Sequence, residues 1–406
     1  MPGPLSGIKV VELSTFVAGP VTARLLGDMG AEVIKVESPT GDSWRISGLG
    51  YSERFSLQEN PIFDIYNSGK QHISLNLKSP EGKEAFFKLL SEADVFVTNT
   101  RPAALKRLGI AYEDLKEKFP RLVYGIVLGY GEEGPDAHKP AFDTTAFWSR
   151  SGFLRDLAVK NEMYEPVVAP SGVGDTATAY LLMGEICAAL YRRSVTGTGD
   201  FVSATLYHTG IFCMGTMVTI AQAPFGRIYP HDRVDSSGIS GAYECADGEW
   251  LFLAMGNRQV NLPKYYTIIG PPELNDDPRY KVGANIWAHR HTLYGLFREA
   301  FLSKTSAEWT QIADEYDLPL IKLSHFSDVS EDPQAWANGF LERVAFPNGH
   351  VDIMPTSPIE MASACPPPTQ PAPPNGAHTA QILLSLGYTQ AQVDAMLESG
   401  AAIAAK

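Results

Sequence analysis

The feature that most constrains this fold is the regular alternation of short buried strands and amphipathic helices over the first two hundred residues. GIKVVEL predicts a strand, the segment after Pro20 (VTARLLGDMG) predicts a helix, and EVIKVES predicts a second strand. HISLNL, the helical segment SPEGKEAFFKLLSEA and the strand DVFVTNT repeat this order. Because a helix that joins two neighbouring strands brings the second strand in parallel to the first, the spacing predicts an α/β fold with a Rossmann-like parallel sheet.

The rest of the chain predicts a smaller second domain. An apolar stretch from Tyr207 to Gln222 predicts a buried linker helix, and the strand-like GAYECADG and EWLFLAM that follow precede aromatic-rich helices, which is typical of an α+β domain. CPPPTQPAPPNG predicts a surface linker, and Thr389 with Gln392 predicts a capping box. We therefore expect a Rossmann-like domain over residues 1–205, a linker helix over 206–226, a small α+β domain over 227–325, and a linker with a C-terminal segment that returns to the large domain over 326–406.

The charge and the chain's opening exclude several functions. The sequence has 33 basic and 46 acidic residues and a net charge of −13, whereas nucleic-acid binding needs a basic surface. We find no signal peptide and no run near the roughly 18 apolar residues of a membrane span. Four scattered cysteines fit reduced thiols, so the sequence predicts a cytoplasmic protein. His289 and His291 have no further ligand at metal-binding spacing, and we expect no metal site.

The segment PSGVGDTATAY holds the strongest candidate for chemistry. Gly172 and Gly174 permit a tight approach to a long predicted helix, and Asp175 falls at or next to its N-cap. A carboxylate there lies beside free backbone amides and the positive helix end, which would keep it ionised and could bind an oxyanion. An ionised carboxylate is a covalent nucleophile. These residues fit an ordinary helix cap as well, because Asp is a favoured N-cap.

Ordered blocks along the chain resemble the family III CoA-transferases. PLSGIKVVELSTFVAGPVTARLLGDMGAEVIKVESPTGD is similar to the family's opening, NSGKQHISLNLKSPEGKE and DVFVTNTRPAALKRLGI to its next blocks, and AWANGFLERVAFPNG to a later one. PSGVGD falls where the family has its catalytic aspartate, so the resemblance implies that Asp175 is the nucleophile and forms aspartyl anhydride and aspartyl-CoA intermediates. It also implies acyl-CoA and carboxylic acid substrates, no permanently bound cofactor, and an interlocked homodimer of ring-shaped chains.

A narrower resemblance concerns the acid that accepts CoA. GYGEEGP and PAFDTTAFWSRSGF are similar to the branch that acts on 2-hydroxy acids, such as phenyllactate, in amino-acid fermentation. The family's α-methylacyl-CoA racemases place a His directly before an Asp in this block, but here Phe142 precedes Asp143. Because an aromatic ring cannot accept an α-proton, the sequence favours a transferase over a racemase. A CoA-binding protein without turnover is the alternative from another functional class.

The resemblance also implies the residues that contact the substrates. CoA contacts fall on Val17, Ala18, Leu75, Lys78, Asn99, Arg107 and Leu108; substrate or oxyanion contacts fall on Phe142, Asp143, Gly174, Gly256 and Asn257, with backbone amides from Gly174 to Thr176 as donors. Lys and Arg suit the CoA phosphates because they form charge-assisted hydrogen bonds. The loop AMGNRQ fits an ordinary turn equally well.

Two positions depart from the formyl-CoA branch of the family. Val17 stands where that branch carries Gln, so an amide contact is missing. Ser38 stands where it carries Arg, and we expect Arg45 or Arg101 to make the phosphate contact instead.

Overall fold

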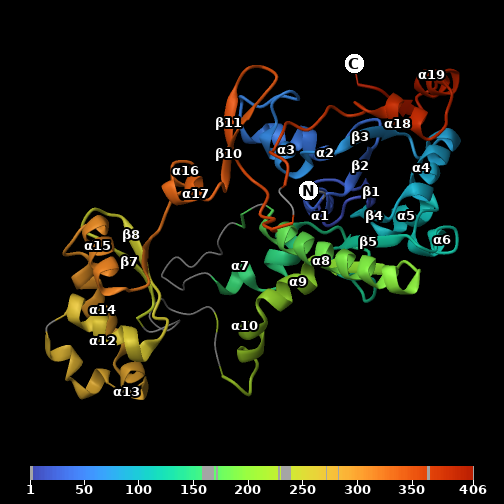
Figure 1. Ribbon diagram of the computed structural model, residues 1–406. Helices are drawn as coiled ribbons and strands as arrows, with labels where there is room; N and C mark the ends of the chain where they lie inside the picture. The colour runs from blue at the N-terminus through green and yellow to red at the C-terminus, as the bar shows by residue number, and fades with distance from the viewer. Residues whose placement is uncertain are drawn as a thin grey trace. The chain divides into compact units, whose positions relative to one another are not determined.

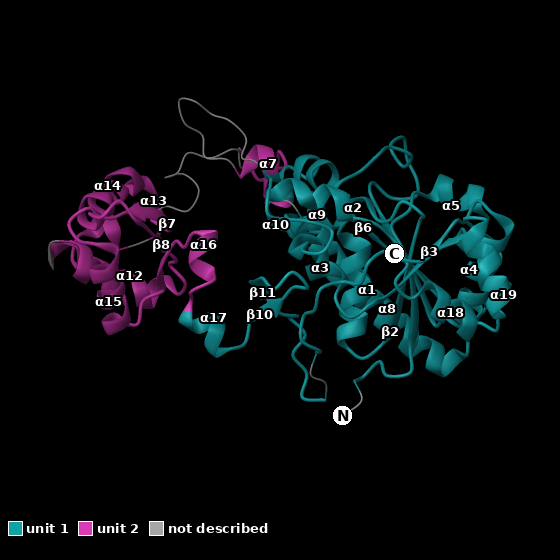
Figure 2. Cartoon of the chain, turned by 90° about the horizontal axis from the view of Figure 1, so that it is seen from above, with its two compact units in different colours: residues 1–153, 169–218, 333–406 teal, residues 154–168, 219–332 magenta. Residues whose placement is uncertain are grey.

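The computed structural model describes residues 3–157, 169–170, 172–226, 229, 239–270, 272–281, 283–363 and 366–405. The chain forms two compact units, which are coloured separately in Figure 2. Unit 1 comprises residues 1–153, 169–218 and 333–406, and unit 2 comprises residues 154–168 and 219–332. Cys365 of the Pro-rich segment lies outside the described residues.

Unit 1 is built on one sheet with the strand order β12-β3-β2-β1-β4-β5-β6 (Figure 1). Neighbouring strands from β3 to β6 pair in parallel, which confirms the predicted parallel sheet, and the edge strand β12 is antiparallel to β3. The order changes direction between β1 and β4, and ligands of such sheets bind outside the carboxyl ends of the strands at this point. In sheet order the strands are β12 (Ala402–Ile403), β3 (Gln71–Leu75), β2 (Glu32–Glu37), β1 (Lys9–Leu13), β4 (Val95–Thr98), β5 (Val123–Leu128) and β6 (Phe201–Thr205).

Helices cover both faces of this sheet (Figure 2). On one face α1 (Ala18–Asp28) packs against α8 (Val173–Thr196). The other face is covered by α4 (Pro80–Glu92), α5 (Pro102–Leu108), α6 (Tyr112–Leu115), α18 (Thr379–Ser385) and α19 (Gln390–Glu398), whose apolar side chains form the main core with the strands. None of the helices in the described ranges is long and apolar enough to span a membrane.

Side chains cap the starts of two of these helices, and the second cap was predicted from the sequence. The Ser79 hydroxyl accepts a hydrogen bond from the Gly82 amide, 3.1 Å away, at the start of α4. Thr389 and Gln392 form the expected capping box of α19. Both satisfy amides that have no partner inside their helix.

The apolar stretch from Tyr207 to Gln222 is not the single buried helix that was predicted. The segment forms two short helices, α9 (Leu206–Cys213) and α10 (Gly215–Ile220), which are separated at Met214. Gly215, next to this break, favours helix poorly because it is a glycine. Within the chain, apolar side chains of both helices are exposed, including Phe212 at 83% and Met217 and Val218 at 40% each.

The C-terminal part of unit 1 is tied back onto α3 (Pro61–Asn67). The hairpin β10 (Leu341–Ala345) and β11 (Val351–Pro355), which follows α17 (Pro333–Ala337), packs against this helix. In the Pro-rich segment, the Ala372 amide donates to Asp64 at 3.0 Å, and the Pro373 carbonyl accepts from Arg45 at 2.9 Å. The linker is therefore held along the surface of unit 1 by its own backbone. The short turns α2 (Ser43–Ser47) and η1 (Gly48–Tyr51) precede α3.

Unit 2 has its own sheet and core. The antiparallel sheet β7 (Gly241–Glu244), β8 (Trp250–Leu253) and β9 (Leu320–Lys322) packs with a core rich in aromatic side chains. The accompanying helical elements are α12 (Arg258–Ile269), η3 (Pro272–Asn275), η4 (Pro278–Tyr280), α13 (Gly283–Ala288), α14 (Arg290–Phe301), α15 (Ser306–Tyr316) and α16 (Phe326–Val329). The short α7 (Phe153–Asp156) lies where the chain passes from unit 1 to unit 2.

A network of buried charges lies beneath the first strands of unit 1. Lys35 Nζ lies 2.7 Å from Glu12 Oε1 and 3.0 Å from Asp42 Oδ2, and Lys70 Nζ lies 2.7 Å from Glu12 Oε2. Burial alone would raise the pKa of Glu12, but the charges of Lys35 and Lys70 outweigh it and lower this pKa to about 2. The Glu12 carboxylate is therefore ionised, and the network links β1, β2 and the loop after β2.

Removing Lys35 tests how far unit 1 depends on this network. In Lys35→Met the carboxylates of Glu12 and Asp42 lose their shared cation while still buried, which typically costs about 3–5 kcal/mol. The control is Lys9→Met, because Lys9 pairs with Glu92 at the surface and such pairs contribute about 0–1 kcal/mol. Urea unfolding of both variants measures the difference, and equal losses of unfolding free energy would contradict the role of the network.

Candidate active site

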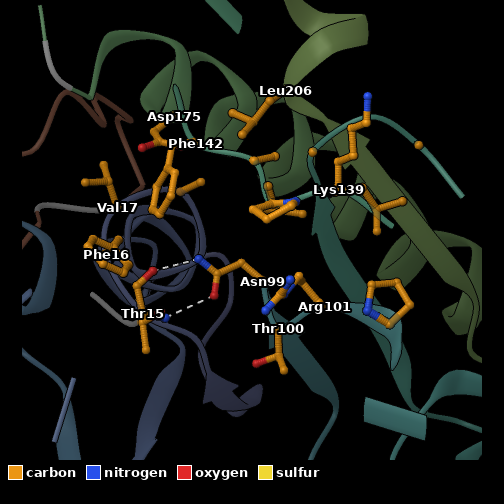
Figure 3. Close-up of a pocket in the computed structure, with 18 of the residues that line it drawn as sticks. Thr15, Phe16, Val17, Asn99, Thr100, Arg101, Lys139, Phe142, Asp175 and Leu206 are labelled. Atoms are coloured by element: carbon orange, nitrogen blue, oxygen red, sulfur yellow. Dashed lines mark hydrogen bonds between the residues drawn. The ribbon is translucent and has the colours of Figure 1, made fainter. Parts of the chain in front are cut away.

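The candidate site is a hollow of about 420 Å³ at the carboxyl edge of the sheet in unit 1 (Figure 3). The loops after β1, β4 and β5 form its walls, so it lies where the strand order changes direction. Its lining comprises Thr15, Phe16, Val17, Ala18, Asn99, Thr100, Arg101, Pro102, Val127, Leu128, Gly129, Gly131, Ala137, Lys139, Pro140, Ala141, Phe142, Asp175 and Leu206. One carboxylate, Asp175, and two cationic side chains thus face the same space.

One wall of the hollow is a fixed segment of backbone after β1. Asn99 holds it from β4: its Oδ1 accepts from the Thr15 amide at 3.0 Å, and its Nδ2 donates to the Thr15 carbonyl at 2.6 Å. The next residue, Phe16, has φ of +63°, a conformation that non-glycine residues rarely adopt. Its amide donates to Asp42 Oδ1 at 3.1 Å. The buried charge network therefore extends, through Asp42, to the wall of the site.

Asp175 lies in the first turn of α8, and another residue caps this helix. The N-cap position is Gly172, which has φ of +86° and no side chain to cap with. Asp143 supplies the missing acceptor from the π-helical turn η2 (Asp143–Ser149): its Oδ2 accepts from the Gly172 amide at 2.9 Å. The ordinary N-cap interpretation of Asp175 does not hold, and its side chain, third in the helix, lines the hollow.

The close approach of α8 to η2 depends on Gly174. A Cβ on this residue would lie 2.2 Å from Phe147 Cγ and 2.3 Å from Asp143 Oδ1, closer than real Cβ contacts allow. A glycine is therefore required for Asp143 to reach the start of α8. The Phe142 ring, which precedes this carboxylate, is 55% exposed at the hollow, and its centroid lies 5.8 Å from that of Phe16.

The ionisation of Asp175 differs from the expectation that the helix end keeps it charged. Burial, and secondly the charge of Asp143, raise the pKa of Asp175 to about 7. Burial also raises the pKa of Asp143, although the amides of Gly172 and Gly174 act in the opposite direction. Asp143 thus receives the stabilisation from the helix end that we expected for Asp175.

One of the expected oxyanion donors is already bonded: the Thr176 amide donates to the Gly172 carbonyl at 2.9 Å within the helix. The Gly174 and Asp175 amides lower the pKa of Asp143, but Asp143 Oδ1 has no hydrogen-bond partner in the described part of the chain. Gly256, with φ of +54°, and Asn257 belong to unit 2. Asn257 caps α12 there by accepting from the Gln259 amide at 3.1 Å. The contribution of this loop to the site stays a prediction.

The other predicted contacts fall into two groups. Val17, Ala18 and Asn99 line the hollow with Asp175. The remaining four lie elsewhere in unit 1. Leu75 is buried in the core, and Lys78 is exposed just after β3. Leu108 packs at the edge of the core. Arg107 lines a neighbouring hollow, and Arg101 lines both this hollow and the first one.

Arg101 is a better candidate than Arg45 for the phosphate contact that Ser38 cannot make. Arg45 is buried and already bonded to Glu37, with Nε–Oε2 and Nη2–Oε1 distances of 2.8 and 2.7 Å. Arg101, in contrast, lines the hollow. Sequence reasoning missed Lys139, which also lines it and pairs with Asp136 at 2.6 Å. The strand order could have indicated it, because loops after β5 belong to the same carboxyl edge.

No group of three or more His, Cys, Asp or Glu side chains is arranged to hold a metal ion in the part of the chain that the structure describes. The polar groups of the hollow are instead one carboxylate, two cations and several amide or hydroxyl groups. This set suits a negatively charged organic substrate next to a carboxylate nucleophile.

Comparisons with known proteins agree on one family. The family model of CoA-transferase family III matches residues 5–379 of this chain. The chain is 39% identical to (R)-2-hydroxy-4-methylpentanoate CoA-transferase of Clostridioides difficile, covering 97% of this chain and 98% of that one. It is 35% identical to cinnamoyl-CoA:phenyllactate CoA-transferase of Clostridium sporogenes, over 96% and 95% of the two chains.

Solved structures with the same fold give a consistent picture. A CAIB/BAIF family protein from Brucella suis has a TM-score of 0.79 and 27% identity, covering 95% of this chain and all of that one (100%). Rv3272 from Mycobacterium tuberculosis, in its orthorhombic form, has a TM-score of 0.80 and 25% identity, over 93% and 98% of the two chains.

Two glycine substitutions in α8 test the close approach at its start. Gly174→Ala should destabilise the protein by about 1–3 kcal/mol, because its Cβ forces Phe147 and Asp143 to move. Gly184→Ala is the matched control: a Cβ there meets nothing within 4 Å, and alanine should stabilise the helix by up to about 1 kcal/mol. Urea unfolding measures both, and a neutral Gly174→Ala would contradict the packing described.

Proposed function

Because this chain belongs to CoA-transferase family III, we propose that it transfers CoA from an acyl-CoA to a 2-hydroxy acid with the Asp175 carboxylate as nucleophile. The observation that carries the proposal is the position of Asp175. It is placed by the first turn of α8 into the hollow at the carboxyl edge, in the same space as Arg101 and Lys139. A nucleophile and partners for phosphate groups are thereby available in one site.

The first half of the proposed reaction activates the aspartate. The ionised Asp175 carboxylate attacks the thioester carbonyl of the donor, the C–S bond breaks, and a mixed anhydride and CoA thiolate result. The thiolate then attacks the aspartyl carbonyl, which releases the donor acid as its carboxylate and leaves an aspartyl-CoA thioester. Each step exchanges one acyl bond for another, so the activated acyl group is not hydrolysed as long as the site excludes water.

The second half reverses these steps with the acceptor. The acceptor carboxylate attacks the aspartyl thioester, thiolate leaves, and a second anhydride forms. The thiolate attacks the acceptor's acyl carbon, which gives the new acyl-CoA and regenerates the Asp175 carboxylate. No net proton is consumed, and the reaction needs no input besides the donor thioester.

The environment of Asp175 suits this role in two ways. Its raised pKa, near 7, means a carboxylate more basic, and therefore more nucleophilic, than an exposed aspartate. Asp143 lies close enough to raise that pKa and is itself fixed by the Gly172 amide. We assign Asp143 a positioning and electrostatic role, and assign CoA contacts to Val17, Ala18, Asn99, Arg101 and Lys139, with Arg107 in the adjoining hollow.

The relatives support the class of acid that we propose. The two bacterial transferases named above act, by their names, on 2-hydroxy-4-methylpentanoate and phenyllactate. Both are 2-hydroxy acids, which supports this class of acceptor for the present chain. A role in amino-acid fermentation, an interlocked homodimer, and substrate or oxyanion contacts from Gly256 and Asn257 belong to the same proposal.

Two alternatives are less well supported. An α-methylacyl-CoA racemase needs a second base, but Phe142 offers only an aromatic ring at that position of the hollow. A CoA-binding protein without turnover would not need a carboxylate of raised pKa in its pocket. It would also not need Gly174, which allows Asp143 to approach the start of α8. Deuterium uptake at the α-carbon of an acyl-CoA without an acceptor acid would favour the racemase.

Replacing the nucleophile tests the proposal directly. Asp175→Asn keeps the shape of the side chain but not its charge, so transfer from acetyl-CoA or butyryl-CoA to (R)-2-hydroxy-4-methylpentanoate or phenyllactate should fall at least about 1,000-fold. CoA binding, followed by calorimetry, should survive. Glu185→Gln, on the same helix, is the control and should retain activity. Transfer that persists in Asp175→Asn would sink the proposal, as would a wild-type protein that transfers CoA between none of these pairs.

The pH dependence provides a second test. Because the nucleophile is the ionised form, kcat/KM for the donor should rise with pH through a midpoint near 7, the pKa of Asp175. Asp143→Asn removes the neighbouring charge but can still accept from the Gly172 amide, so the midpoint should move downwards. Burial remains, and the pKa should stay above the ordinary 3.8. An unchanged or upward-shifted midpoint would contradict the assigned coupling.

A further inference from the structure

Tyr66 of α3 places a hydroxyl group beside the start of α8. A Cβ on Gly172 would lie 3.3 Å from Tyr66 Oη and 3.8 Å from Val17 Cγ1. Val17 lines the hollow with Asp175, whereas the side chain of Tyr66 lines a neighbouring cavity of about 460 Å³ in unit 1. The phenol therefore stands beside the start of α8 and lines a second, largely apolar cavity.

The ring of Tyr66 is held, but its hydroxyl is not engaged. The ring packs against an apolar cluster that includes Val17, Trp44 and Phe63. Within the described part of the chain, its hydroxyl makes no hydrogen bond. Its oxygen is not among the buried polar atoms that lack a partner, so the hydroxyl is open to a ligand and free to donate to it.

The charge state of this phenol suits a donor. Burial first, and then the charge of Asp175, raise the pKa of Tyr66 to about 12. The hydroxyl therefore keeps its proton between about pH 7 and pH 12, the range in which Asp175 is already ionised.

One amide group that could meet an oxyanion here is already used, because the Thr176 amide is bonded within the helix. The Gly174 and Asp175 amides act on the neighbouring Asp143 carboxylate and lower its pKa. Val17 is apolar and adds no donor to this side of the hollow.

We propose that the Tyr66 hydroxyl donates a hydrogen bond to the oxyanion that forms when Asp175 attacks an acyl-CoA thioester. This inference rests on the function proposed above. When the carboxylate oxygen bonds to the thioester carbon, the carbonyl π electrons move onto the thioester oxygen. This oxygen becomes negative, and it is bonded to the carbon that Asp175 has attacked. A hydroxyl that does not contact the resting carboxylate can donate to this oxyanion once it forms. An interaction that exists only in the transition state lowers the activation barrier without tightening substrate binding. Collapse of the oxyanion expels the thiolate, and the phenol keeps its proton throughout.

The test is Tyr66→Phe, which removes one oxygen atom from a packed ring. With acetyl-CoA or butyryl-CoA as donor and (R)-2-hydroxy-4-methylpentanoate or phenyllactate as acceptor, kcat should fall about 100-fold, whereas both KM values and CoA binding should change less than about twofold. Tyr388→Phe is the matched control, because its hydroxyl bonds Glu84 elsewhere in unit 1, and it should leave kcat unchanged. Replacement of Tyr66 by 3-fluorotyrosine keeps the donor and should retain most of the activity.

Other outcomes separate this inference from the proposed function. An unchanged kcat in Tyr66→Phe, or a raised KM for the acid with kcat unchanged, would overturn the oxyanion role while the transferase stands. A loss of kcat matched by a fall in the unfolding temperature, or shared by the fluorotyrosine protein, would show a structural role only. A wild-type protein that transfers CoA between none of these pairs would overturn the proposed function and this inference with it.

Discussion

The contact between the first turn of α8 and η2 is the constraint on which the candidate site depends. Gly174 has no side chain, so Asp143 can approach the helix start and accept from the Gly172 amide. This one contact caps a 24-residue helix from a distance, points Asp175 into the hollow, and brings a second carboxylate close to it. A side chain at position 174 would push Asp143 away from the start of α8, and all three effects would be lost.

A second constraint holds the opposite wall. Lys35 joins Glu12 to Asp42, and Asp42 in turn accepts from the amide of Phe16, whose backbone is in a rarely populated conformation. Such a conformation persists only where the surroundings determine it. Buried charges are expensive to desolvate and are therefore poor general stabilisers. Here they join the first strands to the loop that lines the site, and that loop is also fixed by Asn99 from β4.

The same burial serves both the electrostatics and the chemistry. It raises the pKa of Asp175 to about 7. In the proposed mechanism, this gives a more basic nucleophile, and the burial limits the water that would hydrolyse an anhydride. At the helix end, the Gly172 amide is bonded to Asp143. The neutral donor that we propose for the oxyanion is therefore the Tyr66 hydroxyl, which lies beside Gly172.

The sequence by itself determined the parallel sheet, the long helix that begins at the two glycines, and the identity of Asp175 as the residue to examine. These follow from local periodicity and from ordered family blocks, both of which are written in contiguous residues. The tertiary structure decided what surrounds that residue: Asp143 as the helix cap, Arg101 rather than Arg45 as the available cation, and Tyr66 beside Gly172. It also exposed Phe212 in a segment that was predicted to be buried because it is apolar. The reason is physical. Which amide, charge or hydroxyl is free depends on partners distant in the chain, and local patterns carry no record of those pairings.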